Sequence, residues 1–283
     1  MNRFAALGTV AVLSCATAAS ALTFTPTQDN RQIYAGTVIF SDTDGDTKTP
    51  LSAFSTFDDQ VWANSDYDGF FANAHADQFS ELGSMYIQGS GFAEAQIGVS
   101  FDNWQTSNAE ADTGGSGITM QSNDVSGGSQ SLLEILFSID MDAHYDLSGS
   151  IGAGIQEASG TIDYGSNQST SVVLFDIDHG IALVDESVMD GDQDISTSGH
   201  LGPGNYRFTV DASVEVFGTA SEADNSLTQG PPGGDIYSVN AGFEGINLTL
   251  SSRDKPIPEP VTTTLAGLGL GALAFQTTKR RRA

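Results

Sequence analysis

The chain has 283 residues, with 32 Gly, 36 Asp and Glu, and only 10 Lys and Arg, so its formal net charge is −26 at pH 7. Half of the cations lie outside Leu22–Lys255, which leaves this body with a net charge of about −30. Such a body repels phosphate backbones, and this excludes nucleic acid as a partner. Aromatic and β-branched residues are spread along the chain and predict a packed fold rather than a disordered one.

Residues 1–21 have the order of a secretory signal peptide. Arg3 supplies the positive charge, and the residues from Phe4 to Ala18 are apolar or small and carry no charge. Ala19 and Ala21 then form the small-x-small pattern that a signal peptidase requires. We therefore predict export of the chain, with cleavage after Ala21.

The single cysteine, Cys15, lies inside this segment. The residues Val12-Leu13-Ser14-Cys15 leave a lipoprotein signal open as an alternative. Cleavage after Ala21 removes Cys15, so the mature chain must be stabilised by packing without disulfides.

The body reads as β-strands, because apolar residues alternate with polar ones and no stretch keeps a helical period of 3.6 residues. The clearest strand covers residues 206–216 and follows the turn residues Leu201-Gly202-Pro203-Gly204-Asn205. This stretch resembles the penultimate hairpin of many bacterial β-sandwich modules. The alternating apolar residues of the strand are Tyr206, Phe208, Val210, Ala212, Val214 and Val216.

A second strand pattern changes phase near the end of the body. The apolar positions run from Tyr237 to Phe243 at every second residue, and then continue in the opposite phase from Ile246 to Leu250. A one-residue slip would turn the apolar set outward unless a bulge absorbs it. We therefore predict a β-bulge beside Gly245.

Shorter strand patterns cover residues 34–40, 85–101, 135–141 and 172–177, and Ala72, Ala74 and Ala76 favour a strand in the ambiguous segment 53–82. The run 172–177 is almost continuously apolar and predicts a central strand. About nine to twelve strands are expected, in an all-β, antiparallel, jelly-roll-like β-sandwich.

We expect residues 22–252 to form the body as one domain. The segment 106–130 is rich in Ser, Asn, Asp and Gly, and it is either a long loop or the boundary between two domains. Residues 227–235 are a second expected loop, and residues 253–257 are a stalk leading to the tail.

Two acidic segments are candidate calcium sites, since carboxylates at alternate positions of a turn can supply several oxygen ligands at once. Neither has the glycine and the twelfth-position acid of an EF-hand loop. Asp and Gly are also common in ordinary turns, and a plain acidic turn is the alternative. The candidate ligands are Asp42, Asp44 and Asp46 in one segment, and Asp190, Asp192 and Asp194 in the other.

No motif assigns a catalytic residue, and we expect the body to be non-catalytic. The four histidines have no zinc-site spacing, and Asp176-Ile177-Asp178-His179 is either an acid–base or metal cluster or a polar strand end. A carbohydrate-binding module is the first alternative, and a secreted glycan hydrolase is the second. Five aromatic residues either stack on a sugar or pack in the core, and they are Trp62, Tyr67, Phe70, Phe71 and Trp104.

The C-terminal tail has three parts in a fixed order. Pro258-Glu259-Pro260 is followed by the uncharged segment Val261–Thr278, and then by the four cations Lys279, Arg280, Arg281 and Arg282. Eighteen residues of helix reach about 27 Å, close to the thickness of a bilayer core. Clustered cations stay on the cytoplasmic side, so this tail predicts a transmembrane helix of defined orientation.

This order resembles the PEP-CTERM sorting signal of Gram-negative bacteria. The resemblance covers residues 258–283, and the polar Gln276-Thr277-Thr278 departs from the usual pattern. It implies processing by an exosortase-type membrane protease that recognises Pro258-Glu259-Pro260. It also implies anchoring in the inner membrane before processing, then display at the cell surface or in an extracellular matrix, in association with exopolysaccharide or biofilm.

Overall fold

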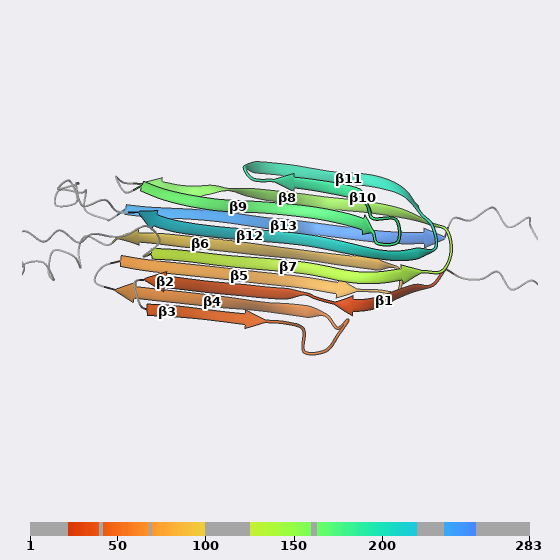
Figure 1. Cartoon of the computed structure of the whole chain (residues 1–283), viewed down its shortest axis with the longest axis horizontal. Helices are drawn as coiled ribbons and strands as arrows, with labels where there is room; N and C mark the ends of the chain where they lie inside the picture. The colour runs from red at the N-terminus through yellow and green to blue at the C-terminus, as the bar shows by residue number, and fades with distance from the viewer. Residues whose placement is uncertain are drawn as a thin grey trace, which may run out of the picture.

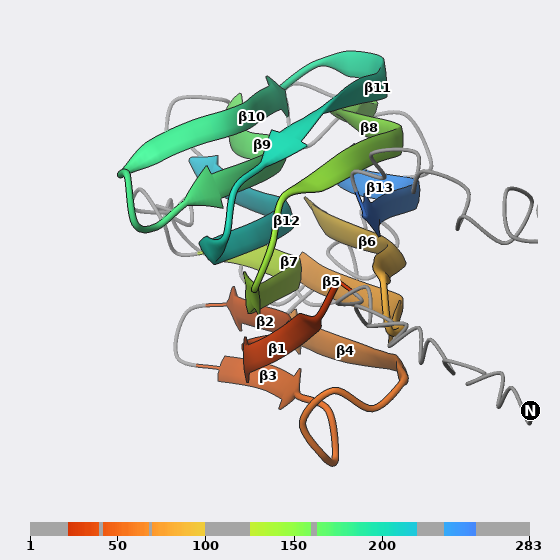
Figure 2. The ribbon, with the colours of Figure 1, turned by 90° about the vertical axis from the view of Figure 1, so that its right-hand side faces the viewer.

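The computed structural model describes residues 22–39, 42–67, 70–99, 125–159, 163–219 and 235–252. These residues form thirteen β-strands and no helix, in two antiparallel sheets that pack face to face (Figures 1 and 2). The all-β prediction is confirmed. Within the described ranges, no helix is long and apolar enough to cross a membrane. The predicted signal peptide, the stalk and the tail with its predicted span at 261–278 lie outside the described residues.

The first sheet has the spatial order β10-β9-β12-β7-β2-β3, and β1 also pairs with β7. Its strands are β1 (Phe24–Asp29), β2 (Gln32–Ile39), β3 (Asp42–Lys48), β7 (Val125–Ile139), β9 (Asp163–Asp176), β10 (Ile181–Val188) and β12 (Gly204–Thr219).

The second sheet has the order β11-β8-β13-β6-β5-β4. Its strands are β4 (Phe57–Tyr67), β5 (Phe70–Leu82), β6 (Tyr86–Val99), β8 (Ala143–Ser159), β11 (Gly191–Leu201) and β13 (Asp235–Ser252). Strand β6 pairs with β5, which precedes it in the chain, and with β13, which follows it. Strand β7 likewise pairs with the earlier β2 and the later β12. A domain boundary at 106–130 would therefore cut through both sheets.

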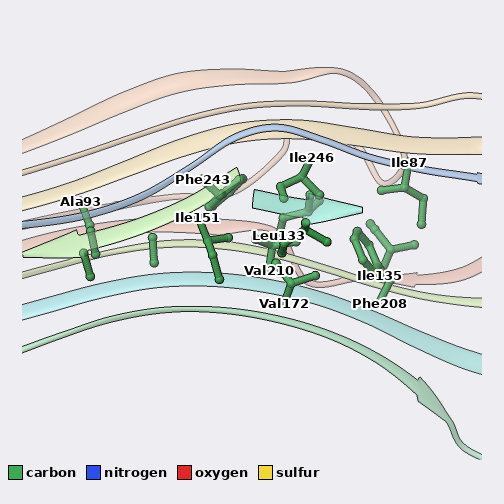
Figure 3. Close-up of a cluster of buried hydrophobic side chains, with 14 of the residues drawn as sticks. Ile87, Ala93, Leu133, Ile135, Ile151, Val172, Phe208, Val210, Phe243 and Ile246 are labelled. Atoms are coloured by element: carbon green, nitrogen blue, oxygen red, sulfur yellow. The ribbon is translucent and has the colours of Figure 1, made fainter. Parts of the chain in front are cut away.

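The core lies between the sheets and is built by two-residue alternation (Figure 3). In β7 every second residue is buried from Val125 to Ile139, and in β12 the predicted inward set from Tyr206 to Val216 is buried without exception. Alternate residues point to opposite faces of a strand, so one apolar set per strand fills the interior. Among the most central side chains are Ile87, Leu133, Ile135, Ile151, Val172, Phe208, Val210, Phe243 and Ile246.

The predicted β-bulge is confirmed. Phe243 pairs with Gly91 and Ile246 with Gly89, so β13 uses one residue more than β6 between these two pairs. Gly245 has a φ of 59°, a left-handed conformation that glycine adopts without strain. The bulge restores the inward phase, and Ile246 and Leu248 are fully buried after it.

Three local predictions were wrong. The turn after Leu201 exists, but β11 and β12 belong to different sheets and do not form a hairpin. The acidic segment 42–46 is part of strand β3 rather than a turn, and residues 125–130 of the expected linker begin β7. The first error arises because turn residues show where a chain changes direction, and not which strand becomes its neighbour.

A buried ion pair ties the start of β2 to the second sheet. Arg31 is 1% exposed, and its Nε and Nη2 donate to the two carboxylate oxygens of Asp29 at 2.8 and 2.6 Å. Arg31 Nη2 also donates to the carbonyl of Ser55 at 2.6 Å, and Nη1 to the hydroxyl of Ser80 at 3.1 Å. The backbone N–H of Phe54 donates to Asp29 Oδ2 at 2.7 Å. Every carboxylate oxygen of this pair is thus hydrogen-bonded, as a buried charge requires.

The two ends of the body lie at the same end of the sandwich. Phe24 pairs with Ile139 and Ser252 pairs with Ala143, and these two partners flank one short connection between β7 and β8 (Figure 1). The first and the last described strand segments of the body therefore lie close to each other at this end.

Candidate functional site

The outer face of the second sheet contains an open groove of about 700 Å³. It crosses the middle of the sheet, over strands β5, β6, β13, β8 and β11. The polar and aromatic side chains that line it are Asp77, Ser90, Phe92, Ser150, Asp192, Asp194, Asn240 and Glu244.

Two paired glycines form the floor of the groove. Gly242 of β13 pairs with Gly152 of β8 on one side and with Phe92 of β6 on the other. A Cβ at Gly152 would lie 2.4 Å from Asp192 Oδ1, so this carboxylate extends over the glycine. The absence of side chains on two neighbouring strands makes the hollow, and Asp77 and Asp192 stand on opposite sides of it.

An aromatic row leads across the same face toward the groove. Trp62 of β4 pairs with His75 of β5, and their rings stack with centroids 3.7 Å apart and an interplanar angle of 18°. The His75 ring is 6.2 Å from that of Phe92. Trp62 is 54% exposed, whereas tryptophan side chains in folded proteins are on average largely buried. Stacking holds its ring in a fixed orientation on the surface.

The second sheet is acidic throughout. Its strands contain no Lys or Arg within the described bounds, and four carboxylates line the groove. Burial raises the pKa of Asp77; the nearby Asp58 carboxylate also raises it, while His75 and the backbone N–H of Phe92 act in the opposite direction. The Nε2 atom of His75 is buried and has no hydrogen-bond partner in the described part of the protein.

The structure separates the two predicted calcium segments. Asp192 and Asp194 lie on the outer face of β11 and line the groove, and Asp190 lies in the connection from β10. Asp42, Asp44 and Asp46 alternate along the exposed edge strand β3. Asp44 Oδ2 accepts a hydrogen bond from the backbone N–H of Asn64 at 2.9 Å, so this side chain joins β3 to the neighbouring edge strand β4.

Calcium binding stays a prediction: among the described residues, no three His, Cys, Asp or Glu side chains are grouped so that they could hold a metal ion. If calcium binds only the folded chain, it stabilises that state by about 2.7 kcal/mol at a hundredfold excess over Kd. The melting temperature of the full chain is then higher in calcium chloride than in sodium chloride of equal ionic strength, which controls for screening. Equal melting temperatures would contradict the prediction.

The segment Asp176–His179 has a structural role in the described fold. Asp176 accepts a hydrogen bond from the backbone N–H of His179 at 3.0 Å and contacts its Nδ1 at 2.9 Å. Asp178 accepts hydrogen bonds from the backbone and the side chain of Asn205, which lower its pKa. These contacts join the turn after β9 to the start of β12. They engage the same Asp and His side chains that suggested an acid–base or metal cluster in the sequence.

The aromatic residues considered for sugar stacking differ in their exposure to solvent. Trp62 is an exposed ring, whereas Phe70 is buried in the core and Phe71 is half-buried. The Tyr67 side chain and Trp104 lie outside the described residues.

The sequence did not indicate the rest of the groove. His75, Asp77, Phe92 and Glu244 come from three strands, and no local motif joins them. The available signal was the alternation at 72–77, which places His75 and Asp77 on the polar face of one strand. Comparison of the chain with protein-family models and with characterised proteins gave no match.

Proposed function

We propose that the chain is an exported, non-catalytic protein of the cell surface or extracellular matrix. The tail carries this proposal: a Pro-Glu-Pro tripeptide, an uncharged segment and a terminal cation cluster follow one another in the order of a PEP-CTERM signal. The fold supports it, because Leu22 and Ser252 lie at the same end of the body. Both flanking segments can thus face one membrane while the sandwich extends away from it.

In this proposal an exosortase-type protease processes the chain at Pro258-Glu259-Pro260, and Lys279–Arg282 hold the tail on the cytoplasmic side until then. The mature body then lies among exopolysaccharide. We also propose that the sandwich is jelly-roll-like. The chain changes sheet from β7 to β8 and again from β8 to β9, and this alternation between the sheets supports the proposal.

Replacing Lys279, Arg280, Arg281 and Arg282 with Gln should loosen or invert the anchoring. The cations determine orientation because they resist transfer across the membrane. Expression in a Gram-negative host that has an exosortase, followed by fractionation and protease accessibility, measures the effect. Arg253→Gln, a cation outside the cluster, is the control and should leave anchoring unchanged.

Intact-mass analysis of surface material tests the proposal as a whole. The wild-type product should lack residues 1–21 and part of the tail. A soluble cytoplasmic product that retains Met1 and Ala283 would contradict export and processing together.

A carbohydrate-binding body is a second candidate function. The outer face of the second sheet favours it, since the exposed Trp62 ring, stacked on His75, lies on the same face as a groove lined by several hydrogen-bond acceptors. Small numbers of polar groups placed beside an apolar surface are typical of ligand sites.

A further inference from the structure

We propose that the groove and its aromatic row bind a glycan that carries free amino groups, such as a polymer of de-N-acetylated hexosamine. This inference rests on the proposed function, because it supplies the extracellular ligand of an exported body. It adds that the glycan is positively charged, whereas the proposed function does not specify the charge of the glycan.

The ring of Trp62 provides the apolar contact. A pyranose has one face of C–H bonds, and that face packs against a flat aromatic ring while the hydroxyl groups around its edge stay available for hydrogen bonds. Trp62 is 54% exposed and is held against His75 at a centroid distance of 3.7 Å. Its ring is therefore oriented before a ligand arrives, which reduces the entropy lost on binding.

The floor of the groove admits a ligand close to the backbone. Gly152 and Gly242 are paired on adjacent strands and have no side chain of their own, and the Asp192 carboxylate extends over Gly152. A chain of sugars that lies across β8 and β13 therefore meets this carboxylate directly. Asp192, Asp77 and Glu244 surround this floor and offer carboxylate oxygens. Carboxylates form strong, charge-assisted hydrogen bonds with ammonium groups and accept hydrogen bonds from hydroxyls.

The charge of the sheet selects among glycans. None of the side chains that line the groove belongs to Lys or Arg, and four of them are carboxylates, so a glycan with uronic acids or phosphates would be repelled there. An amino-bearing glycan is complementary to this surface, and complementary charge favours both encounter and specificity. Asp192 and Asp194, two residues apart on one strand, are separated by about 6.6 Å along it. Each of these two carboxylates can therefore meet an ammonium group of its own.

Isothermal titration calorimetry tests the proposal, with the full chain in a mild nonionic detergent as the protein. The probes are glucosamine oligomers with free amino groups and their N-acetylated counterparts. We expect the amino oligomers to bind at least tenfold more tightly than the N-acetylated ones. Their affinity should fall several-fold as sodium chloride is raised from about 50 to about 500 mM, because salt screens the carboxylates.

Variants separate this site from general attraction to an acidic protein. Trp62→Ala should weaken binding about tenfold, and the double variant Asp192→Asn/Asp194→Asn should weaken it by at least as much. Tyr34→Ala is the matched control, since Tyr34 is an exposed aromatic residue on the other sheet and should leave binding unchanged. These substitutions are on the surface and should change stability little, which melting temperatures verify.

Three results would overturn the proposal. One is equal binding of amino and N-acetylated oligomers, and a second is loss of binding in Tyr34→Ala equal to that in Trp62→Ala. The third is a combined result, in which poly-lysine displaces the amino oligomers completely and Trp62→Ala binds these oligomers as tightly as the wild type does. That result would indicate attraction to charge alone. Failure of export in cells leaves all of these measurements interpretable, because they use purified protein.

Discussion

Arg31→Ala should destabilise the protein by about 3–5 kcal/mol, because it leaves the buried carboxylate of Asp29 without its partner. Arg31 is fully enclosed, and its guanidinium binds Asp29, Ser55 and Ser80 from three separate parts of the chain. Arg31→Lys should also be strongly destabilising, since an ammonium group cannot reproduce the bidentate geometry. Urea unfolding of the full chain, followed by circular dichroism, measures the free energy.

Lys48→Ala provides the matched control. Lys48 also pairs with an aspartate, Asp59, but the two side chains are 38% and 41% exposed. Exposed pairs contribute about 0–1 kcal/mol, so this variant should unfold close to the wild-type midpoint. Similar losses in Arg31→Ala and Lys48→Ala would show that burial of the Arg31 pair has no special effect.

The Arg31 pair also gives stability a defined pH dependence. Burial alone would raise the pKa of Asp29, but the hydrogen bonds from Arg31 and Phe54, together with the Arg31 charge, lower it below the usual value. A carboxyl with a lowered folded-state pKa contributes stability above its unfolded pKa, about 4, and loses it as the pH falls through the folded value. The stability difference between the wild type and Asp29→Asn should therefore shrink as the pH falls below about 4.

The fold class was predictable because a two-residue period follows directly from strand geometry. The pattern from Tyr206 to Val216 and the change of phase at Gly245 both appear in the structure as expected. Strands without apolar alternation were missed. β3 is acidic and the start of β7 is rich in Ser and Gly, and each is a strand because its backbone pairs with β2. Such pairing depends on residues far away in the chain, which no local pattern encodes.

The groove illustrates the same limit for function. Trp62 and Asp192 were candidates from the sequence, one as a sugar-stacking residue and the other as a calcium ligand. They lie at opposite edges of one sheet, on β4 and β11, and the strands between them bring in Phe92 and Gly242. The order of strands in the sheet, rather than any spacing along the chain, places these residues on one surface.

The second large effect is expected at Gly149, on β8 opposite the bulge. Gly149 has a φ of 144°, which side-chain-bearing residues rarely adopt, and a Cβ there would lie 2.8 Å from Cα and 2.9 Å from N of Ile246. These contacts are with backbone atoms, which cannot rotate away as a flexible side chain can. Gly149→Ala should therefore destabilise the protein by about 2–5 kcal/mol, through overpacking and backbone strain together.

Two further glycines separate these causes in the same unfolding experiment. Gly245→Ala introduces a Cβ into open space at a φ of 59°, so it should show only the conformational penalty, about 1–2 kcal/mol. Gly202→Ala has neither a left-handed φ nor an atom within 4 Å of the new Cβ, and it should stay within about 0.5 kcal/mol of the wild type. The expected order of loss is Gly149, then Gly245, then Gly202. A Gly149→Ala variant no less stable than Gly245→Ala would mean that β8 can move away from the bulge.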